Sequence, residues 1–125
     1  MKISGEVKTG TKKAQRFLSL KPYKDRIEEK TGFRPFHGTL NLKVDEDKHR
    51  KLKKEKEEQR IEGFNYEGND YGGLELYRIS IEGLNAALLD IDRADHGDEI
   101  AEIIAEEKLR AELGLEDGDE VEINA

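Results

Sequence analysis

The apolar residues of this chain occur in short runs where they alternate with polar ones, and this spacing limits the folds open to it. Residues 38–44 (GTLNLKV) carry leucine or valine at every second position, which gives a strand one apolar and one polar face. Residues 2–8 (KISGEVK) repeat the pattern around Ile3 and Val7, with Gly5 marking a bulge or a close backbone approach. These strands do not alternate regularly with helices, so the sequence predicts a mainly β fold, either a small barrel or an α+β domain.

Further short strands are expected at residues 61–66, 71–81, 84–91 and around Val121 and Ile123. Gly68–Asp70 is typical of a hairpin turn between strands 61–66 and 71–81. Gly83 is typical of a turn between strands 71–81 and 84–91. The apolar positions of 71–81 change parity near Tyr77 and Arg78, which predicts a shift of register there.

Two short helices are expected. Residues 23–30 (YKDRIEEK) read as a helix of two turns that Gly32 would end, and residues 106–113 (EEKLRAEL) as another that stops at Gly114. Residues 99–105 (EIAEIIA) fit either a helix or a strand.

Charge is the second constraint, because 41% of the 125 residues are charged and only 34% are hydrophobic. Such a composition resembles that of disordered chains. However, much of the charge lies in Asp45–Arg60, where Leu52 is the single aliphatic residue, and this stretch reads as a solvated helix or a mobile excursion. We therefore expect one folded domain over residues 1–125 that contains this charged excursion.

Several classes of protein are disfavoured. The chain has no cysteine, so disulfides, thiolate metal sites and a cysteine nucleophile are excluded. No apolar run reaches the length of a membrane span, and the N-terminus lacks a signal region, so we expect a cytoplasmic protein without a membrane partner. The net charge of −7 argues against nucleic-acid binding. A P-loop, a His-Glu-x-x-His zinc motif and a Gly-x-Ser-x-Gly elbow are absent from the sequence.

The strand 38–44 carries a pair of residues suited to a metal bound together with phosphate. Thr39 and Asn41 project from the same face and offer neutral oxygen ligands. Such a pair holds a bare ion poorly, but it can complete the shell of a Mg²⁺ that phosphates and water already surround. By pattern alone, an ordinary amphipathic strand with two outward polar residues is the favoured interpretation.

Other segments allow anion binding, although each has a plainer alternative. Thr9–Gln15 (TGTKKAQ) could present backbone N–H groups and lysines to phosphate, or be a surface turn. Lys108 and Arg110, at the start of the expected helix 106–113, could bind an anion with their positive charge, or lie on an exposed helix face. The acidic stretch 90–99 is better explained as a solvated loop than as a metal or acid–base site.

Taken in order along the chain, these segments resemble the archaeal CTP-dependent riboflavin kinases. The motifs that carry the resemblance are Gly5-Glu6-Val7, Thr9-Gly10, Phe17-Leu18-Ser19-Leu20-x-Pro22-Tyr23, Gly32-Phe33-x-Pro35-Phe36-x-Gly38-Thr39-Leu40-Asn41-Leu42, His96, Glu99-Ile100-x-Glu102-Ile103-Ile104-Ala105, Lys108-Leu109-Arg110 and Leu115-x-Asp117-Gly118-Asp119. The resemblance as a whole spans nearly the entire chain, and only Asp45–Arg60 falls outside it. The resemblance implies a six-stranded cradle-loop β-barrel with a few short helices, and an enzyme that transfers the terminal phosphate of CTP to riboflavin, giving FMN and CDP.

The resemblance also assigns binding roles to individual residues. It makes Thr39 and Asn41 the ligands of one Mg²⁺ ion and so reverses the interpretation favoured by the pattern alone. Flavin binding falls to Ala94 and Glu102, where Ala94 departs from the hydroxyl residue usual in the family. Nucleotide binding falls to Gly10, Thr11, Lys12, Lys13, Ala14 and Gln15, a segment poorer in glycine than is usual, and to Glu107, Lys108, Leu109 and Arg110.

Two alternatives remain open. The same barrel could be a non-catalytic flavin- or nucleotide-binding module, or a structural protein that interacts through an exposed barrel edge. The sequence identifies no general base and no oligomeric state, and it is compatible with a monomer.

Overall fold

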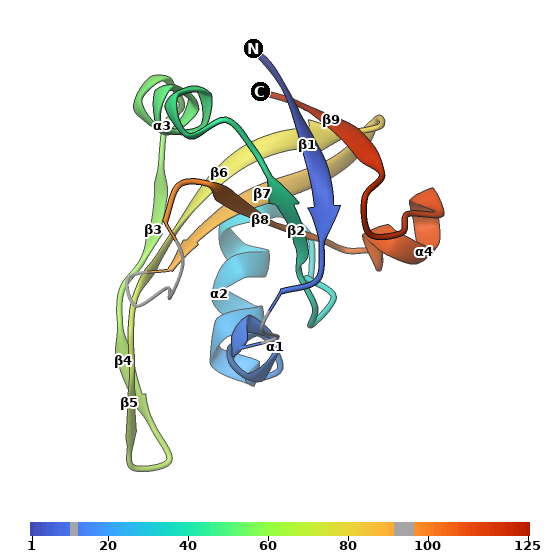
Figure 1. Ribbon diagram of the computed structural model, residues 1–125. Coiled ribbons are helices and arrows are strands. Elements are labelled where there is room, and N and C mark those ends of the chain that lie inside the picture. Colours follow the sequence, from blue (N-terminus) through green and yellow to red (C-terminus); the bar gives the residue numbers. More distant parts are fainter. Residues whose placement is uncertain (11–12, 92–96) are drawn as a thin grey trace.

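A computed structural model describes residues 1–10, 13–91 and 97–125 (Figure 1). Its strands are β1 (Lys2–Lys8), β2 (Leu40–Lys43), β3 (Gln59–Ile61), β4 (Phe64–Tyr66), β5 (Asn69–Tyr71), β6 (Leu74–Ile81), β7 (Leu84–Ile91), β8 (Ile100–Ala105) and β9 (Glu120–Asn124). Its helices are α1 (Lys13–Leu18), α2 (Lys21–Thr31), α3 (Glu46–Glu55) and α4 (Leu109–Leu113). None of the helices in this part of the chain is long and apolar enough to cross a membrane.

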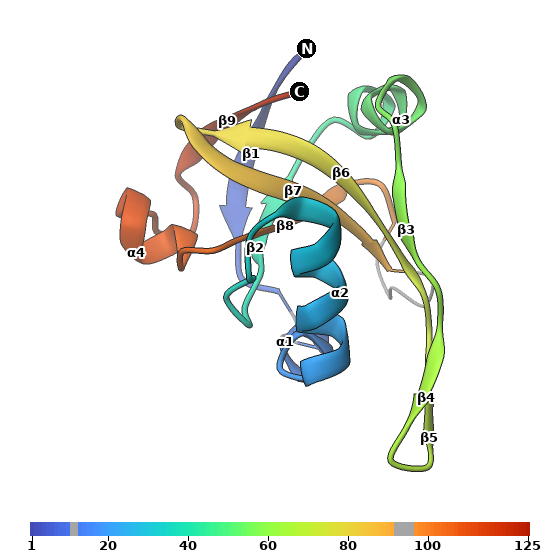
Figure 2. The same ribbon diagram turned by 180° about the vertical axis from the view of Figure 1, so that it is seen from behind.

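Six antiparallel strands close into a barrel in the order β6-β7-β8-β2-β1-β9, because β9 pairs back onto β6. β3 adds to the outside of β6. The two chain ends lie side by side at one end of the barrel, where the Met1 and Ala125 backbones exchange hydrogen bonds (Figure 2). The expected mainly β fold with a six-stranded barrel is therefore confirmed.

The barrel interior takes the alternate residues that the sequence pattern selects. Leu40 and Leu42 from β2 lie with Leu88 and Ile103 in the buried core. A Cβ atom on Gly5 would lie only 2.9 Å from Leu42 Cβ, so the close backbone approach expected at this glycine is confirmed. Residues 99–105, which fitted either helix or strand, are a strand from Ile100 onward, since pairing on both edges buries them almost completely.

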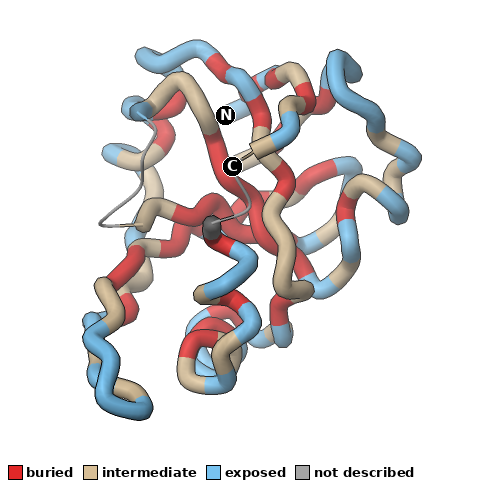
Figure 3. Tube along the Cα trace, turned by 60° about the horizontal axis from the view of Figure 1, so that its bottom comes forward, coloured by how far each residue is buried: buried red, intermediate tan, exposed pale blue. Residues whose placement is uncertain are grey.

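A second apolar cluster covers the outside of the barrel, and it explains the change of parity in β6. Leu74 and Leu76 pack outward against α1 and α2, whereas Ile79 and Ile81 point into the barrel. The β6–β7 ladder runs without interruption from Leu74 to Ile81. The predicted register shift is therefore wrong: both faces of one regular strand are apolar because each face has its own partner. Figure 3 shows this buried centre.

The β4–β5 hairpin extends away from the barrel as an arm with an exposed tip (Figures 1 and 3). The two long strands expected in this region are each divided, into β3 and β4 and into β5 and β6. The turn lies at Glu67 and Gly68, both with positive φ, rather than at Gly68–Asp70. Glu82 and Gly83 form the same kind of turn between β6 and β7.

The charged stretch Asp45–Arg60 contains α3, which Asp45 caps by accepting a hydrogen bond from the Lys48 amide. The helix is docked and not simply solvated, since His49 and Leu52 are buried. The helix expected at 106–113 is shorter than predicted and begins at Leu109. The helix expected at 23–30 is confirmed as α2, and Gly32 ends it with φ 83°.

Candidate active site

A polar cavity of about 450 Å³ opens where β1 ends and β2 begins, beside α4. Its lining includes three cationic side chains, Lys8, Lys108 and Arg110, in a protein whose net charge is −7. Backbone from the end of β1 and from the turn before β2 completes the wall. A local concentration of cations in an acidic chain favours a ligand with several negative charges.

Three residues from two segments meet at the wall of this polar cavity. Lys8 pairs with Asn41 in the β1–β2 ladder, so the chain passes over β2 as β1 ends. A Cβ atom on Gly10 would lie 2.4 Å from Asn41 Nδ2, so only glycine allows this approach. Asn41 Nδ2 in turn donates a hydrogen bond to Thr39 Oγ1 at 3.3 Å. The structure thus brings Gly10, predicted to bind nucleotide, next to Thr39 and Asn41, predicted to bind the metal.

The donor set suits a metal ion that is shared with phosphate. Thr39 and Asn41 both line the polar cavity and offer hydroxyl and amide oxygens. Among the residues that the structure describes, no group of three or more histidines and carboxylates could hold a metal by itself. Two neutral oxygens next to lysine and arginine therefore fit a Mg²⁺ ion whose remaining ligands are phosphate oxygens and water.

Asp117 fixes the position of the cationic side of the cavity. Its carboxylate accepts hydrogen bonds of 2.6 Å from Thr9 Oγ1 and from Arg110 Nη2. Those two bonds, first that of Thr9 and then that of Arg110, lower the pKa of Asp117 below its usual value. Arg110 also donates to the Lys8 carbonyl at 3.1 Å. Asp117 thereby ties the end of β1 to α4 and orients the arginine.

A second cavity, of about 360 Å³, lies on the outer face of the barrel. The residues that line it are mostly apolar and aromatic. They belong to α1, α2, the β4–β5 arm, the start of β6 and the end of β7. Phe17 and Tyr71 meet edge to face with ring centroids 6.4 Å apart. Leu89 and Ile91 supply the barrel side of this apolar cavity. Its shape and chemistry suit a flat, largely apolar ring.

Glu102 lies between the two cavities. It is a buried residue of β8, and its neighbours across the sheet are Asn41 on one side and Leu89 on the other. Asn41 lines the polar cavity, and Leu89 lines the apolar cavity. Side chains opposite one another in an antiparallel ladder lie about 5 Å apart. A ligand that spans both cavities would therefore pass this carboxyl group.

The remaining predicted residues divide into three groups. Gln15, Glu107, Lys108, Leu109 and Arg110 line the polar cavity together with Gly10. Ala14 instead lies in the outer apolar cluster and lines the apolar cavity, because α1 begins at Lys13 and the predicted nucleotide loop is helical from there. Thr11, Lys12 and Ala94 lie outside the described residues, and the side chain of Lys13 is likewise not described.

Sequence reasoning gave no role to several residues that the structure brings to the site. Asp117 belongs to a quoted motif, but its contact with Thr9 joins residues 108 positions apart and leaves no local signal. His37 lines the polar cavity with its ring centroid 4.2 Å from that of Phe36. Tyr71 lines the apolar cavity from the base of the β4–β5 arm, where its ring contacts that of Phe17 in α1.

Comparison with known proteins shows which family the chain resembles. The family model CTP-dep_RFKase, described as a domain of unknown function (DUF120), matches residues 7–125. The chain is 40% identical over 121 residues to a protein named riboflavin kinase from Methanocella arvoryzae, covering 97% of this chain and 55% of that protein. It is 37% identical over 126 residues to one from Archaeoglobus fulgidus, covering 98% and 54% respectively.

A riboflavin kinase from Thermofilum pendens is 40% identical over 129 residues, which is 97% of this chain and 57% of that protein. The chain thus spans somewhat more than half the length of these curated relatives. The family model covers nearly all of the barrel, from the end of β1 to the last residue. The chain therefore belongs to the CTP-dependent riboflavin kinase family.

Proposed function

We propose that this protein is a riboflavin kinase that transfers the terminal phosphate of CTP to the 5′-hydroxyl of riboflavin, giving FMN and CDP. The observation that carries the proposal is the pairing of two unlike cavities across one buried glutamate. A polar, cationic cavity suits a nucleoside triphosphate, and an apolar, aromatic cavity suits the flavin ring. The choice of CTP as the donor rests on the family to which the chain belongs.

On the nucleotide side, Lys8, Lys108 and Arg110 would bind the phosphates. Arg110 is already oriented by Asp117, so little conformational freedom is lost when it meets an anion. A magnesium ion on Thr39 and Asn41 would neutralise charge on the terminal phosphates. Lys12 and Lys13, from the predicted nucleotide-binding segment Gly10–Gln15, remain predicted to bind the phosphates as well.

On the flavin side, the ring would lie in the apolar cavity against Phe17 and Tyr71. Stacked or edge contacts with aromatic side chains supply binding energy beyond that of area alone. Glu102 would accept hydrogen bonds from polar hydrogens of the ring or the ribityl chain, which is the role that the family resemblance predicts for it. The ribityl chain would then extend toward Asn41 and the polar cavity.

Phosphoryl transfer of this kind depends on positioning and charge neutralisation more than on covalent chemistry. The riboflavin 5′-oxygen attacks the terminal phosphorus in line, and the bond from that phosphorus to the bridging oxygen breaks. CDP leaves with the electron pair, and the hydroxyl proton is released as the new bond forms. The residues of this chain bind and orient the two substrates and exclude water between them.

The first test is production of FMN from riboflavin and Mg²⁺ with CTP, ATP, GTP or UTP supplied separately. We expect turnover with CTP well above that with the other three. Binding of riboflavin without any turnover would support the non-catalytic module instead. Failure of every nucleotide to change the thermal midpoint would favour a structural protein.

The metal assignment has its own test. A Thr39→Ala, Asn41→Ala double variant should fold with a near-normal thermal midpoint, because both side chains are only partly buried, and lose kinase activity by at least about a hundredfold. Riboflavin binding, followed by quenching of flavin fluorescence, should persist in this variant. Full activity of the double variant would contradict the proposed role of Thr39 and Asn41.

A further inference from the structure

The charged helix α3 makes specific contacts with the end of β7, which lines the apolar cavity, and with the residues just before β8. His49, Leu52 and Lys53 lie on the face of α3 that packs against the barrel. Leu52 is fully buried in the barrel core. His49 donates a hydrogen bond of 2.8 Å from Nδ1 to the backbone oxygen of Asp98, just before β8. This helix is the part of the chain that the family motifs leave without a role.

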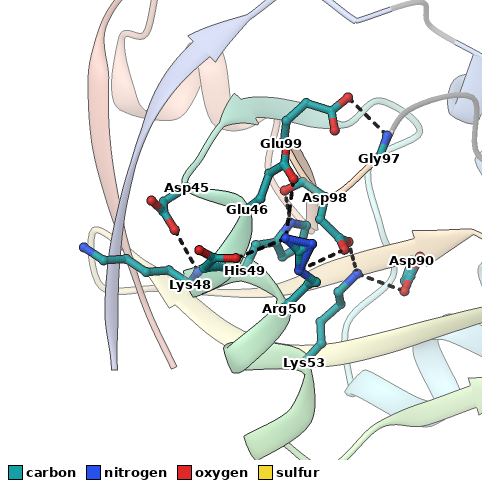
Figure 4. Close-up of polar contacts among 11 residues, drawn as sticks. Asp45, Glu46, Lys48, His49, Arg50, Lys53, Asp90, Gly97, Asp98 and Glu99 are labelled. Atoms are coloured by element: carbon teal, nitrogen blue, oxygen red, sulfur yellow. Dashed lines mark hydrogen bonds and ion pairs between the residues drawn. The ribbon is translucent and has the colours of Figure 1, made fainter.

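Lys53 joins the end of β7 to the start of β8 (Figure 4). Its ammonium nitrogen lies 2.6 Å from Asp98 Oδ1 and 3.3 Å from Asp90 Oδ2. The Lys53 side chain is only 16% exposed, which limits screening of both ion pairs by water and salt. Burial by itself would lower the pKa of Lys53, but the Asp98 and Asp90 carboxylates outweigh that effect and raise the pKa, so the ammonium stays charged.

These ion pairs occur where the backbone pairing between β7 and β8 stops. The ladder between the two strands ends at Leu89 and Glu102. Beyond that pair, Asp90 follows Leu89 on β7, and Asp98 lies four residues before Glu102. Lys53 therefore connects the two strands on the side of Glu102 where no further β7–β8 backbone pair is present among the described residues.

The same strand ends carry the side chains of the proposed flavin site. Asp90 lies between Leu89 and Ile91, and both of these line the apolar cavity. Glu102 continues from the segment that Asp98 anchors. A change in the separation of the two strand ends would move Leu89 and Ile91 relative to Glu102. A displacement of about 1 Å in positioned groups is enough to alter binding or rate substantially.

We propose that Lys53 is a positioning residue for riboflavin, acting through Asp90 and Asp98 to fix the spacing of the β7 and β8 ends on either side of the flavin-binding groups. This inference rests on the proposed function for the identity of the ligand. It gives the charged helix α3 a definite role: the helix is the base from which Lys53 reaches both strands.

The test compares Lys53→Met with Lys54→Met. Both changes remove one lysine charge from the same helix and keep a good helix former, but Lys54 is exposed. We expect Lys53→Met to raise the riboflavin Kd and KM about threefold to tenfold, while the nucleotide KM and kcat stay within about twofold of wild type. Lys54→Met should match wild type, and Lys53→Arg should restore much of the riboflavin affinity.

A double-mutant cycle identifies the route of the effect. If Lys53 acts through Asp98, Lys53→Met combined with Asp98→Asn should cost no more riboflavin affinity than the more harmful single change. Equal riboflavin Kd values for Lys53→Met and Lys54→Met would overturn the proposal. A parallel rise of both substrate KM values would also overturn it, because general loosening of the fold would then be the cause.

Hydrogen exchange separates this inference from the proposed function. Amides in peptides covering residues 86–102 should exchange faster in Lys53→Met than in wild type, and no faster in Lys54→Met. If wild-type protein fails to bind riboflavin, the proposed function fails. If exchange in 86–102 is the same in all three proteins, the role of Lys53 itself is wrong.

Discussion

At the scale of single residues, the polar cavity depends on small side chains as much as on charged ones. Gly10 lets the backbone pass against Asn41, and Asn41 then reaches Thr39. The charged residues that line the cavity are held in position by neighbouring side chains, as Asp117 holds Arg110. Substitutions that add a single methyl group should therefore be as informative as the removal of a charge.

Gly10→Ala tests this dependence. The added Cβ would lie 2.7 Å from Asn41 Cγ, so the amide must rotate away from Thr39. We expect kcat/KM for the kinase reaction to fall about tenfold to a hundredfold, with riboflavin binding unchanged. Gly83→Ala is the control, because the new Cβ meets no atom within 4 Å and the residue lines neither cavity. Its positive φ of 80° should lower the thermal midpoint, while kcat/KM stays at the wild-type value. Unchanged kcat/KM in Gly10→Ala would contradict the proposed contact.

At the scale of elements, β6 and β7 form a regular pair joined by a tight turn. The β6–β7 ladder is the longest in the barrel, and its loop is the two residues Glu82 and Gly83. Both have positive φ, of 47° and 80°. Glycine adopts this conformation without strain, whereas glutamate pays a steric cost that asparagine largely avoids.

Glu82→Asn should therefore stabilise the protein. We expect the free energy of unfolding to rise by about 0.5–1 kcal/mol and the thermal midpoint by about 2–5 °C, because asparagine is favoured at the first position of such a turn. Calorimetry of the purified variant measures both quantities. Glu82→Val is the matched control and should lower the midpoint, since a β-branched side chain is strained at positive φ. A midpoint for Glu82→Asn at or below that of wild type would show that the turn carries no strain.

At the scale of the whole molecule, the charged side chains that the structure describes lie almost entirely outside the barrel core, and Glu102 is the one buried carboxylate among them. Among these described residues His49 is the one buried histidine, so part of the pH dependence of global stability can be traced to it. Burial of His49, partly opposed by its bond to the Asp98 backbone, lowers the pKa of that imidazole below its usual value of 6.5. Asp98 has a lowered pKa chiefly because Lys53 donates a hydrogen bond to it.

These shifts predict two separate ranges of acid destabilisation. Because unfolded His49 binds a proton more readily than folded His49, its contribution is present above about pH 6.5 and is lost as the pH falls toward its lowered folded pKa. The contribution of Asp98 is lost only below its unfolded pKa of about 3.9. The thermal midpoint of wild type should thus decrease as the pH is lowered from 7.5 to 5.5. This decrease should be smaller in His49→Gln, because the glutamine side chain stays neutral. Equal slopes in the two proteins would exclude His49 as the cause.

The sequence by itself determined several of the elements and the chemistry of the residues, because alternation, caps and turns act over a few positions. It predicted β1, the β2 strand with Thr39 and Asn41 on one face, α2, β7 and β9. It also supplied the motifs that place the chain in its family. It did not predict the unbroken β6, because whether an apolar face is covered depends on α1 and α2, which are distant in the chain.

The tertiary structure decided which residues meet. Thr9 contacts Asp117 across 108 positions of sequence, and Lys53 contacts Asp98 across 45, only because the barrel closes and α3 docks against it. The pairing of β8 with β2 on one side and β7 on the other sets Glu102 between Asn41 and Leu89, and so between the two cavities. Local patterns carry no information about such pairs, since they are fixed by the order in which the strands pair and by what packs on each face of the sheet.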